Sequence, residues 1–184
     1  DRRGREQACR GIEIVPRQTP TSDAAWRFTC STSRLGRRNR MRTVAPAAPE
    51  READGARVSY AHPGLVEWYD NGKDGLEQGF TVTARPAGNG SLRIEGRVGG
   101  ALCAELRDEG VDLLDAHGVR VLRYAQLSAW DAGGRALPSR LAVAGGEIAI
   151  EVEDANARYP ITIDPLMTSP AWTAESDQAS ASLG

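Results

Sequence analysis

Two glutamates, Glu67 and Glu77, stand on either side of a segment that is expected to reverse the chain. If their carboxylates approached each other across a hairpin, they could serve a glycosidase, which needs one protonated and one ionised carboxyl group. Three aromatic residues that could hold a sugar ring are close in the sequence, namely Trp68, Tyr69 and Phe80. Glutamates are also typical of the solvent-facing side of a strand, and we favour this structural interpretation.

The segment 70-DNGKDG-75 begins like a calcium-binding loop, because Asp70 and Asp74 stand at two of the expected ligand positions. The third position is Gly72, which offers no side-chain oxygen. The twelfth position is Thr81 where such a loop has a bidentate glutamate. Asp and Asn side chains in tight turns commonly bond their own backbone. The segment therefore predicts a turn and no metal site.

Other signatures of catalysis or cofactor binding are absent from the sequence. It contains no G-x-S-x-G nucleophile motif and no G-x-x-x-x-G-K-[ST] phosphate loop. Cys103 has an apolar setting and is far in sequence from His62 and His117, which stand beside Pro and Gly residues typical of turns. We therefore predict a protein that is not an enzyme, with no catalytic, cofactor-binding or metal-ligating residue.

The three cysteines are Cys9, Cys30 and Cys103. They have no C-x-x-C spacing and no clustered histidines, so a zinc site is not expected. An odd number allows at most one disulfide bond, for which Cys9 with Cys30 is a conceivable pair. The redox state stays open at this point.

Charge is distributed unevenly along the chain. The 184 residues carry a formal net charge of −2, whereas residues 1–50 contain eleven arginines and five acidic residues. The run 34-RLGRRNRMR-42 could bind phosphate groups, but the aromatic residues lie elsewhere and the rest of the chain is acidic. We expect a solvated segment and no nucleic-acid partner. No apolar run approaches the roughly 18 residues of a membrane-spanning helix, so membrane insertion is not expected.

The elements that must position these residues divide the chain into three parts. Residues 1–56 are rich in Arg and Pro and are predicted to be largely irregular and poorly ordered, with strand-like patterns at 11–15 and 25–30. Residues 57–166 are predicted to form an antiparallel β-sandwich-like domain with short hairpins. Residues 167–184 are expected to form a linker and an extended tail.

Alternation of apolar and polar residues supports the β prediction. Ile148 and Ile150 alternate with Glu147 and Glu151, as in a strand with one buried and one wet face. Strands are predicted in this way near residues 57–61, 65–70, 76–84, 91–98, 119–131, 140–145, 147–153 and 161–164.

Turn residues separate the predicted strands. Asn71-Gly72 suits a type I′ hairpin turn, which requires positive φ at both central residues. Gly75 and Gly79 are expected to relieve backbone crowding at a bend or bulge. The segment 101–110 fits either a short helix or another strand. Further candidate turns are Asn89-Gly90, Gly133-Gly134 and Gly145-Gly146.

Two blocks of the sequence, 67-EWYDNGKDGLEQGFTVTARPAG-88 and 159-YPITIDPL-166, resemble the N-terminal β-domain of bacterial exported proteins that carry FG-GAP (integrin-α-like) repeats. The tail 172-WTAESDQASASLG-184 is similar to the start of a first such repeat. The resemblance covers about residues 57–184, and residues 1–45 show little of it. It brings no metal ligand to this sequence, because the calcium loop of an FG-GAP blade has no counterpart here.

This resemblance implies an all-β, non-catalytic domain of an exported or cell-surface repeat protein. Its expected partner is a downstream β-propeller of the same chain, and its expected role is structural or adhesive, through protein or glycan ligands. The alternative is a carbohydrate-binding or glycoside-processing module that uses Glu67, Glu77 and the nearby aromatic residues. Nucleic-acid binding through residues 34–42 is the third, less favoured hypothesis.

Overall fold

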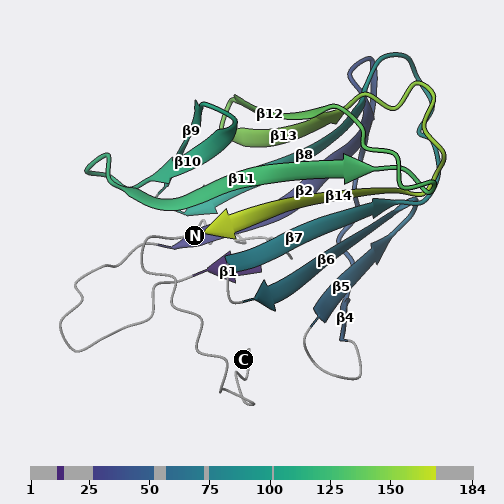
Figure 1. Cartoon of the computed structure of the whole chain (residues 1–184). Helices are drawn as coiled ribbons and strands as arrows, with labels where there is room; N and C mark the ends of the chain where they lie inside the picture. The colour runs from purple at the N-terminus through teal and green to yellow at the C-terminus, as the bar shows by residue number, and fades with distance from the viewer. Residues whose placement is uncertain (1–11, 15–26, 52–56, 73–74, 101, 169–184) are drawn as a thin grey trace, which may run out of the picture.

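Two antiparallel β-sheets packed face to face make up the fold (Figure 1). The computed structural model describes residues 12–14, 27–51, 57–72, 75–100 and 102–168. These residues contain strands and no helix, so the predicted all-β antiparallel sandwich is confirmed. It follows that the same part of the chain holds no helix long and apolar enough to cross a membrane.

The first sheet, which we call sheet A, has the strand order β1-β2-β8-β13-β12 in the described part of the chain, and β3 pairs with β2 beside this path. All of its strand pairs are antiparallel. Its strands are β1 (Ile12–Ile14), β2 (Phe28–Arg37), β3 (Arg40–Thr43), β8 (Leu92–Gly100), β12 (Ser139–Ala144) and β13 (Glu147–Val152).

The second sheet, sheet B, has the order β4-β5-β6-β7-β14-β11-β10-β9 over the same described ranges. It is also antiparallel throughout. Its strands are β4 (Pro49–Arg51), β5 (Arg57–His62), β6 (Leu65–Gly72), β7 (Gly75–Val82), β9 (Cys103–Arg107), β10 (Gly110–Leu114), β11 (Arg120–Trp130) and β14 (Ile161–Thr168).

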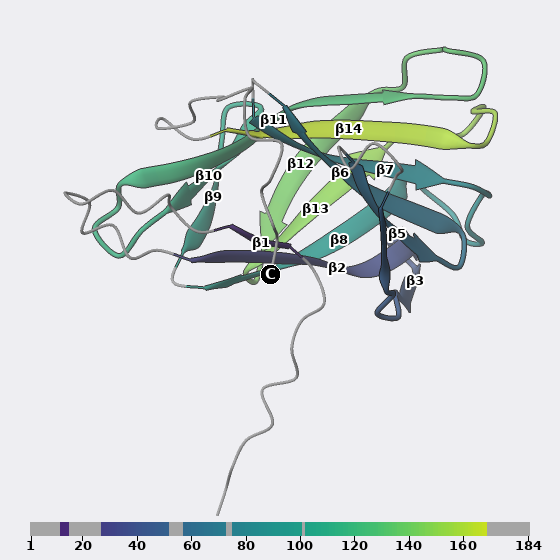
Figure 2. The same cartoon turned by 90° about the horizontal axis from the view of Figure 1, so that it is seen from below.

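The chain passes repeatedly from one sheet to the other, so strands far apart in sequence become neighbours. In sheet A, β2 pairs with β8 and places Leu35 opposite Ile94. In sheet B, β14 lies between β7 and β11. Seen from below, β11 and β14 lie on one side of the sandwich and β2 and β8 on the other (Figure 2).

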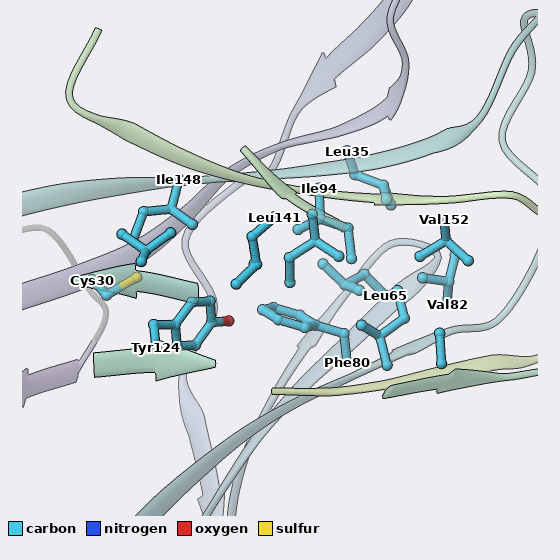
Figure 3. Packing of buried hydrophobic residues seen from close by; sticks show 14 of the residues in the cluster. Cys30, Leu35, Leu65, Phe80, Val82, Ile94, Tyr124, Leu141, Ile148 and Val152 are labelled. Atoms are coloured by element: carbon cyan, nitrogen blue, oxygen red, sulfur yellow. The ribbon is translucent and has the colours of Figure 1, made fainter. Parts of the chain in front are cut away.

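Inward-facing apolar side chains fill the space between the sheets (Figure 3). Successive residues of a strand point to opposite faces, so Ile148 and Ile150 of β13 face the core as their alternation predicted. Burying a side chain of this size stabilises the fold by about 1.5–3 kcal/mol. The most deeply buried apolar side chains are Phe28, Leu35, Leu65, Val82, Leu92, Val111, Leu113, Leu122, Ile161, Ile163 and Met167.

Two of the predicted hairpin turns have different outcomes. Gly145 and Gly146 have φ of 60° and 78° and connect the paired residues Ala144 and Glu147, as a type I′ turn requires. The turn predicted at Asn71-Gly72 is wrong. Both residues are still paired with β7, opposite Leu76 and Gly75, and neither is among the residues of positive φ. The pairing runs through both residues and ends with Gly72 opposite Gly75.

The strand-like patterns at 11–15 and 25–30 are confirmed in their described part by β1 and the start of β2. The prediction of a largely irregular segment before residue 57 is wrong for residues 31–51, where β2 continues and β3 and β4 follow. β2 pairs with β8 along its length, and β4 pairs with β5 across the expected boundary. The arginine-rich run 34–42 lies in the β2–β3 hairpin and its connection. Its charge suggested exposure, but Arg37 is buried and its acidic partner Asp154 lies 117 positions away.

The remaining expectations concern 101–110 and the end of the domain. Of the two alternatives for 101–110, the strand is correct, since β9 and the start of β10 occupy this segment. β14 continues to Thr168, and Met167 is 1% exposed, so residue 167 belongs to the core and not to a linker. The tail from residue 169 onward lies outside the described residues.

Candidate functional site

A cluster of polar side chains lies inside the sandwich. Glu67 and Tyr69 of β6, Gln78 of β7 and Tyr124 of β11 are each at most 5% exposed. We call these four residues the central polar cluster. Glu67 and Tyr69 share the inward face of β6 with Leu65, because residues two apart on a strand point the same way. Sheet B therefore directs one carboxyl group, one amide and two hydroxyl groups into the core.

Hydrogen bonds join all four side chains. Tyr69 OH donates to Glu67 Oε1, and Gln78 Nε2 donates to the same oxygen at 2.7 Å and to Tyr69 OH at 2.9 Å. Tyr124 OH donates to Gln78 Oε1 at 2.9 Å. Leaving a buried polar group without a partner costs about 1–3 kcal/mol, so this connected network makes the burial tolerable.

The two tyrosines act as permanent donors. Burial raises the pKa of Tyr69 well above its ordinary value, and the negative charge of Glu67 raises it further. Burial likewise raises the pKa of Tyr124, with additional contributions from Cys30 and Glu67. Both hydroxyl groups thus keep their protons over the whole physiological range of pH.

Cys30 of β2 faces the central polar cluster from sheet A. Cys30, Gln78 and Tyr124 line one small cavity with a volume of about 20 Å³, large enough for a single water-sized molecule and too small for a substrate. Of these residues, Figure 3 shows Cys30 and Tyr124. Burial raises the pKa of the Cys30 thiol to about 12, the charge of Glu67 adds to the rise, and a side-chain hydrogen bond with Gln78 opposes it. The group is a neutral thiol in contact with the amide across the sheets.

His62 lies at the edge of this cluster, at the end of β5. Its Nδ1 is 2.8 Å from the carbonyl oxygen of Ala45, which can only accept, so Nδ1 carries the proton. Its Nε2 is 3.8 Å from Glu67 Oε2, too long for a hydrogen bond but close enough for an ion pair. Glu67 raises the pKa of His62, and the bond to Ala45 adds to this, while burial and Arg42 oppose it.

Glu67 and Glu77, the predicted glycosidase pair, do not come together. Glu67 lies opposite Phe80 on the inward face, whereas Glu77 lies opposite Asp70 on the outward face. A sheet separates the two carboxylates, because residues at odd and even offsets along a strand point to opposite sides. The paired-carboxylate hypothesis is therefore wrong for these residues.

The aromatic residues of the same block are also used structurally. A Cβ placed on Gly79 would lie 1.8 Å from a ring atom of Trp68, so the indole lies directly over this glycine. The Arg57 guanidinium stacks over the indole at 4.2 Å from its centroid. Trp68 is thus held between Gly79 and Arg57 and is only 8% exposed, which leaves no open face for a sugar ring. Gly79 relieves crowding from a side chain, without a register shift in this strand pair.

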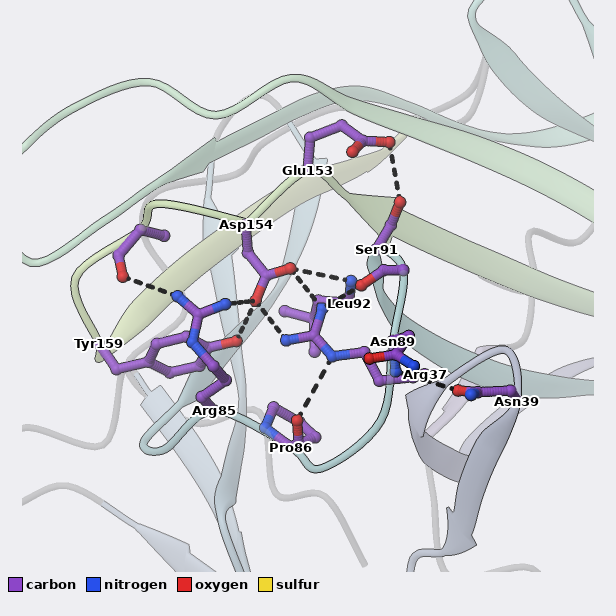
Figure 4. A network of polar contacts seen from close by, with 12 residues as sticks. Arg37, Asn39, Arg85, Pro86, Asn89, Ser91, Leu92, Glu153, Asp154 and Tyr159 are labelled. Carbon is purple, nitrogen blue, oxygen red and sulfur yellow. Dashed lines mark hydrogen bonds and ion pairs between the residues drawn. The ribbon is translucent and has the colours of Figure 1, made fainter.

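A second polar network lies at one end of the sandwich, and we call it the end network (Figure 4). Arg37 at the end of β2 donates two hydrogen bonds to Asp154, from Nη1 to Oδ1 at 2.5 Å and from Nη2 to Oδ2 at 2.7 Å. Arg85 and Tyr159 also donate to Asp154 Oδ2, at 3.1 Å and 2.6 Å. The backbone N–H of Leu92 donates to Oδ1 at 3.2 Å.

Arg37 and Asp154 form the buried ion pair of the end network. Arg37 and Asp154 are 3% and 1% exposed, and Arg37 also donates to the carbonyl oxygens of Pro86 and Gly90. Burial alone would raise the pKa of Asp154, but the bonds from Arg37 and Tyr159 outweigh it and lower the pKa. The network therefore fastens β2 to the loops that follow β7 and β13.

Two further arginines of the run 34–42, Arg34 and Arg38, are ion-paired. On the outward face of sheet A, Arg34 lies 3.1 Å from Glu95 and Arg38 lies 3.1 Å from Glu151. Arg93 bridges both glutamates, at 2.6 Å and 2.5 Å. This alternation of charges is the pattern of a solvated, ion-paired face.

The other residues considered from the sequence lie apart from both networks. Cys103 is exposed on β9, and His117 lies in the turn that Asp115 organises by accepting from the N–H groups of His117 and Val119. Asp74 and Cys9 lie outside the described residues. Within the described ranges, Cys30 and Cys103 are free thiols, and no group of three or more acidic, His or Cys side chains is arranged to hold a metal ion.

Comparisons of the chain with protein-family models, with curated proteins and with solved structures found no match.

Sequence reasoning missed Gln78, Tyr124, Arg37 and Asp154 as partners in buried networks. A local signal existed for the first two, since Gln78 is two residues from Phe80 and Tyr124 two residues from the buried Leu122. No comparable signal marks Arg37 and Asp154, which are 117 positions apart.

Proposed function

We propose that this chain forms a non-catalytic structural and binding domain of an exported or cell-surface repeat protein. The observation that supports this best is the use made of Glu67, Arg37 and Asp154. All three side chains make buried hydrogen bonds that hold the sandwich together. Side chains used in this way build a rigid support, and binding by such a domain takes place on its outer faces and loops.

The resemblance to domains that precede FG-GAP repeats supplies the expected context. In this proposal the sandwich supports and presents a β-propeller that follows it in the same polypeptide, and the assembly contributes to adhesion through protein or glycan ligands. The coding sequence downstream of this segment is then expected to contain D-x-[DN]-x-D-G motifs at a regular spacing of about 50–60 residues, the size of period that marks propellers. A downstream sequence without such a period would contradict the proposal.

Export is tested in the native host. A tagged copy of the complete gene product is expected to be cut by protease added to intact cells, while a cytoplasmic marker protein stays whole. Adhesion is tested with the purified chain on glycan and matrix-protein arrays. Full protection of the tagged product from added protease would exclude the cell-surface location.

The same purified chain tests the alternative of a glycoside-processing module. Wild type, Glu67→Gln and Glu77→Gln are expected to hydrolyse polysaccharides at one common background rate. Glu77 is the matched control, because it is the same residue type on the opposite face of sheet B. A wild-type rate above background that falls in Glu67→Gln alone would overturn the non-catalytic proposal.

A further inference from the structure

The Cys30 thiol and the Gln78 amide meet in the core from opposite sheets. Cys30 belongs to β2 and is 7% exposed, and Gln78 belongs to β7 and is 2% exposed. Both line the interior cavity of about 20 Å³. A sulfur nucleophile and a carboxamide therefore line the same small cavity between the sheets.

The hydrogen bonds on the Gln78 amide activate it for attack. Tyr124 OH donates to Oε1 at 2.9 Å, where negative charge would develop as a nucleophile adds to the carbonyl carbon. Nε2, which would leave, is bonded at 2.7 Å to Glu67 Oε1, a group able to deliver a proton to it. A donor on the carbonyl oxygen and a carboxyl group on the leaving nitrogen are the two aids that acyl transfer requires.

We propose that Cys30 and Gln78 condense to an internal thioester that covalently joins the two sheets. The Sγ–H bond of Cys30 and the Cδ–Nε2 bond of Gln78 break, and a bond between Sγ and Cδ forms. Glu67 takes the thiol proton and returns it to Nε2, so ammonia leaves and Glu67 ends as it began. No oxidant, metal or other reactant takes part.

The cavity and the burial fit this reaction in two respects. Ammonia is about the size of a water molecule, so a cavity of about 20 Å³ can receive it before it escapes. Escape into bulk solvent dilutes the ammonia and draws the condensation forward. The deep burial of both partners then shields the thioester from hydrolysis, so the bond serves as an internal staple.

Thr32 lines the same cavity and is the competing nucleophile. Its hydroxyl would give an ester with the same loss of ammonia. We assign the reaction to Cys30 because sulfur is intrinsically much the stronger nucleophile.

The test is the mass of the purified 184-residue chain under denaturing conditions. Wild type is expected to be lighter than its sequence by one ammonia molecule. Proteolysis should yield the peptides of Cys30 and Gln78 joined together, and hydroxylamine should separate them and free the Cys30 thiol. A chain of full sequence mass, with Cys30 open to alkylation after denaturation, overturns the proposal.

Variants assign the bond to its partners. Cys30→Ala should restore the full mass, and Thr32→Val should keep the ammonia loss. The reverse result would overturn the assignment to Cys30. Asn-Gly sequences such as Asn89-Gly90 can also lose ammonia by forming a succinimide, so a loss that persists in Cys30→Ala equally overturns the proposal. The peptide map of wild type gives the same answer if a variant fails to fold.

A further variant tests the activating donor. Tyr124→Phe removes the hydroxyl group that bonds Gln78 Oε1 and should lower the fraction of linked chain in protein harvested early after synthesis. A fraction equal to that of wild type would overturn the role given to Tyr124.

Discussion

The central polar cluster and the end network bury charge in opposite ways. In the end network the Asp154 carboxylate has a bidentate arginine, a second arginine, a hydroxyl group and a backbone N–H as donors. In the central polar cluster the Glu67 carboxyl group has the neutral donors Tyr69 and Gln78, and His62 is the nearest cation, at 3.8 Å. One region surrounds its carboxylate with cationic donors, and the other surrounds its carboxyl group mainly with neutral ones.

Both regions hold the sandwich together, and the difference bears on the chemical role that we propose for Glu67. A carboxylate held by arginine has little capacity to accept a proton, because its pKa is lowered. The Glu67 carboxyl group instead receives its hydrogen bonds from the neutral donors Tyr69 and Gln78. Four measurements test the difference between the two networks, and they follow in decreasing order of the expected effect.

The largest effect is expected from Asp154→Asn. This change leaves Arg37 buried and without its carboxylate partner, which costs about 3–5 kcal/mol of the free energy of unfolding. Denaturant titration measures the loss. The neighbouring Glu153→Gln is the control, because the Glu153 side chain is 54% exposed and should change stability by less than about 0.5 kcal/mol. Equal losses would show that the end network does not depend on its charge pair.

Removal of one hydroxyl group from each region comes next. Tyr69→Phe takes one of the two side-chain donors from Glu67 Oε1 and should cost about 1–3 kcal/mol. Tyr159→Phe should cost less than about 1 kcal/mol, because Asp154 keeps three other donors. Both values come from denaturant titrations under the same conditions. The opposite order would contradict the view that the end network is the more redundant of the two.

The two regions should lose stability at opposite ends of the pH range. The folded pKa of His62 is raised, so its contribution is complete below the unfolded pKa of about 6.5 and is lost as the pH rises through the folded value. The folded pKa of Asp154 is lowered, so its contribution is present above the unfolded pKa of about 3.9 and is lost as the pH falls.

His62→Gln should therefore flatten the dependence of the unfolding free energy on pH above about pH 6.5 and leave the acid side unchanged. Asp154→Asn should do the reverse. Denaturant titrations of both variants and of wild type at a series of pH values measure this. Parallel curves for wild type and His62→Gln would show that His62 does not titrate with folding.

The smallest effect is expected on the outward face of sheet A. Arg140 bonds Glu151, but its side chain is 62% exposed, so Arg140→Gln should cost less than about 1 kcal/mol and should cost less still at high salt. Arg93→Gln provides the contrast, since Arg93 is 14% exposed and bridges Glu95 and Glu151. If the loss of stability in Arg140→Gln did not depend on salt, this ion pair would behave like the pairs in the buried networks.

The alternation of apolar and polar residues was sufficient to predict the β fold after residue 57. This alternation is a local property of a strand, because one face of the strand is buried and the other faces solvent. Strand β13 is an example. The turn at Gly145-Gly146 was predictable for the same reason, because the φ values it needs depend on two adjacent residues. The prediction of a turn at Asn71-Gly72 was wrong because both residues are still paired with β7.

The two networks could not be predicted from local patterns. Arg37 stands in a run that looks solvated, and its burial becomes possible only when Asp154 arrives from a distant loop. Glu67 looked like a surface residue, although its spacing from Leu65 and Tyr69 already placed it on the apolar face of β6. In both cases the charge of the residue was given more weight than its position on the strand. Whether the residue is buried depends on the partner that the fold brings to it.

The position of β14 sets a condition on how the protein can be made. This strand is the last of the described chain, yet it fills the middle of sheet B, between β7 and β11. A ribosome-bound chain that has not yet released Ile161–Thr168 carries two exposed strand edges, each able to pair with another molecule. Completion of the sandwich must wait until these residues emerge, and chains that end before Ile161 should precipitate.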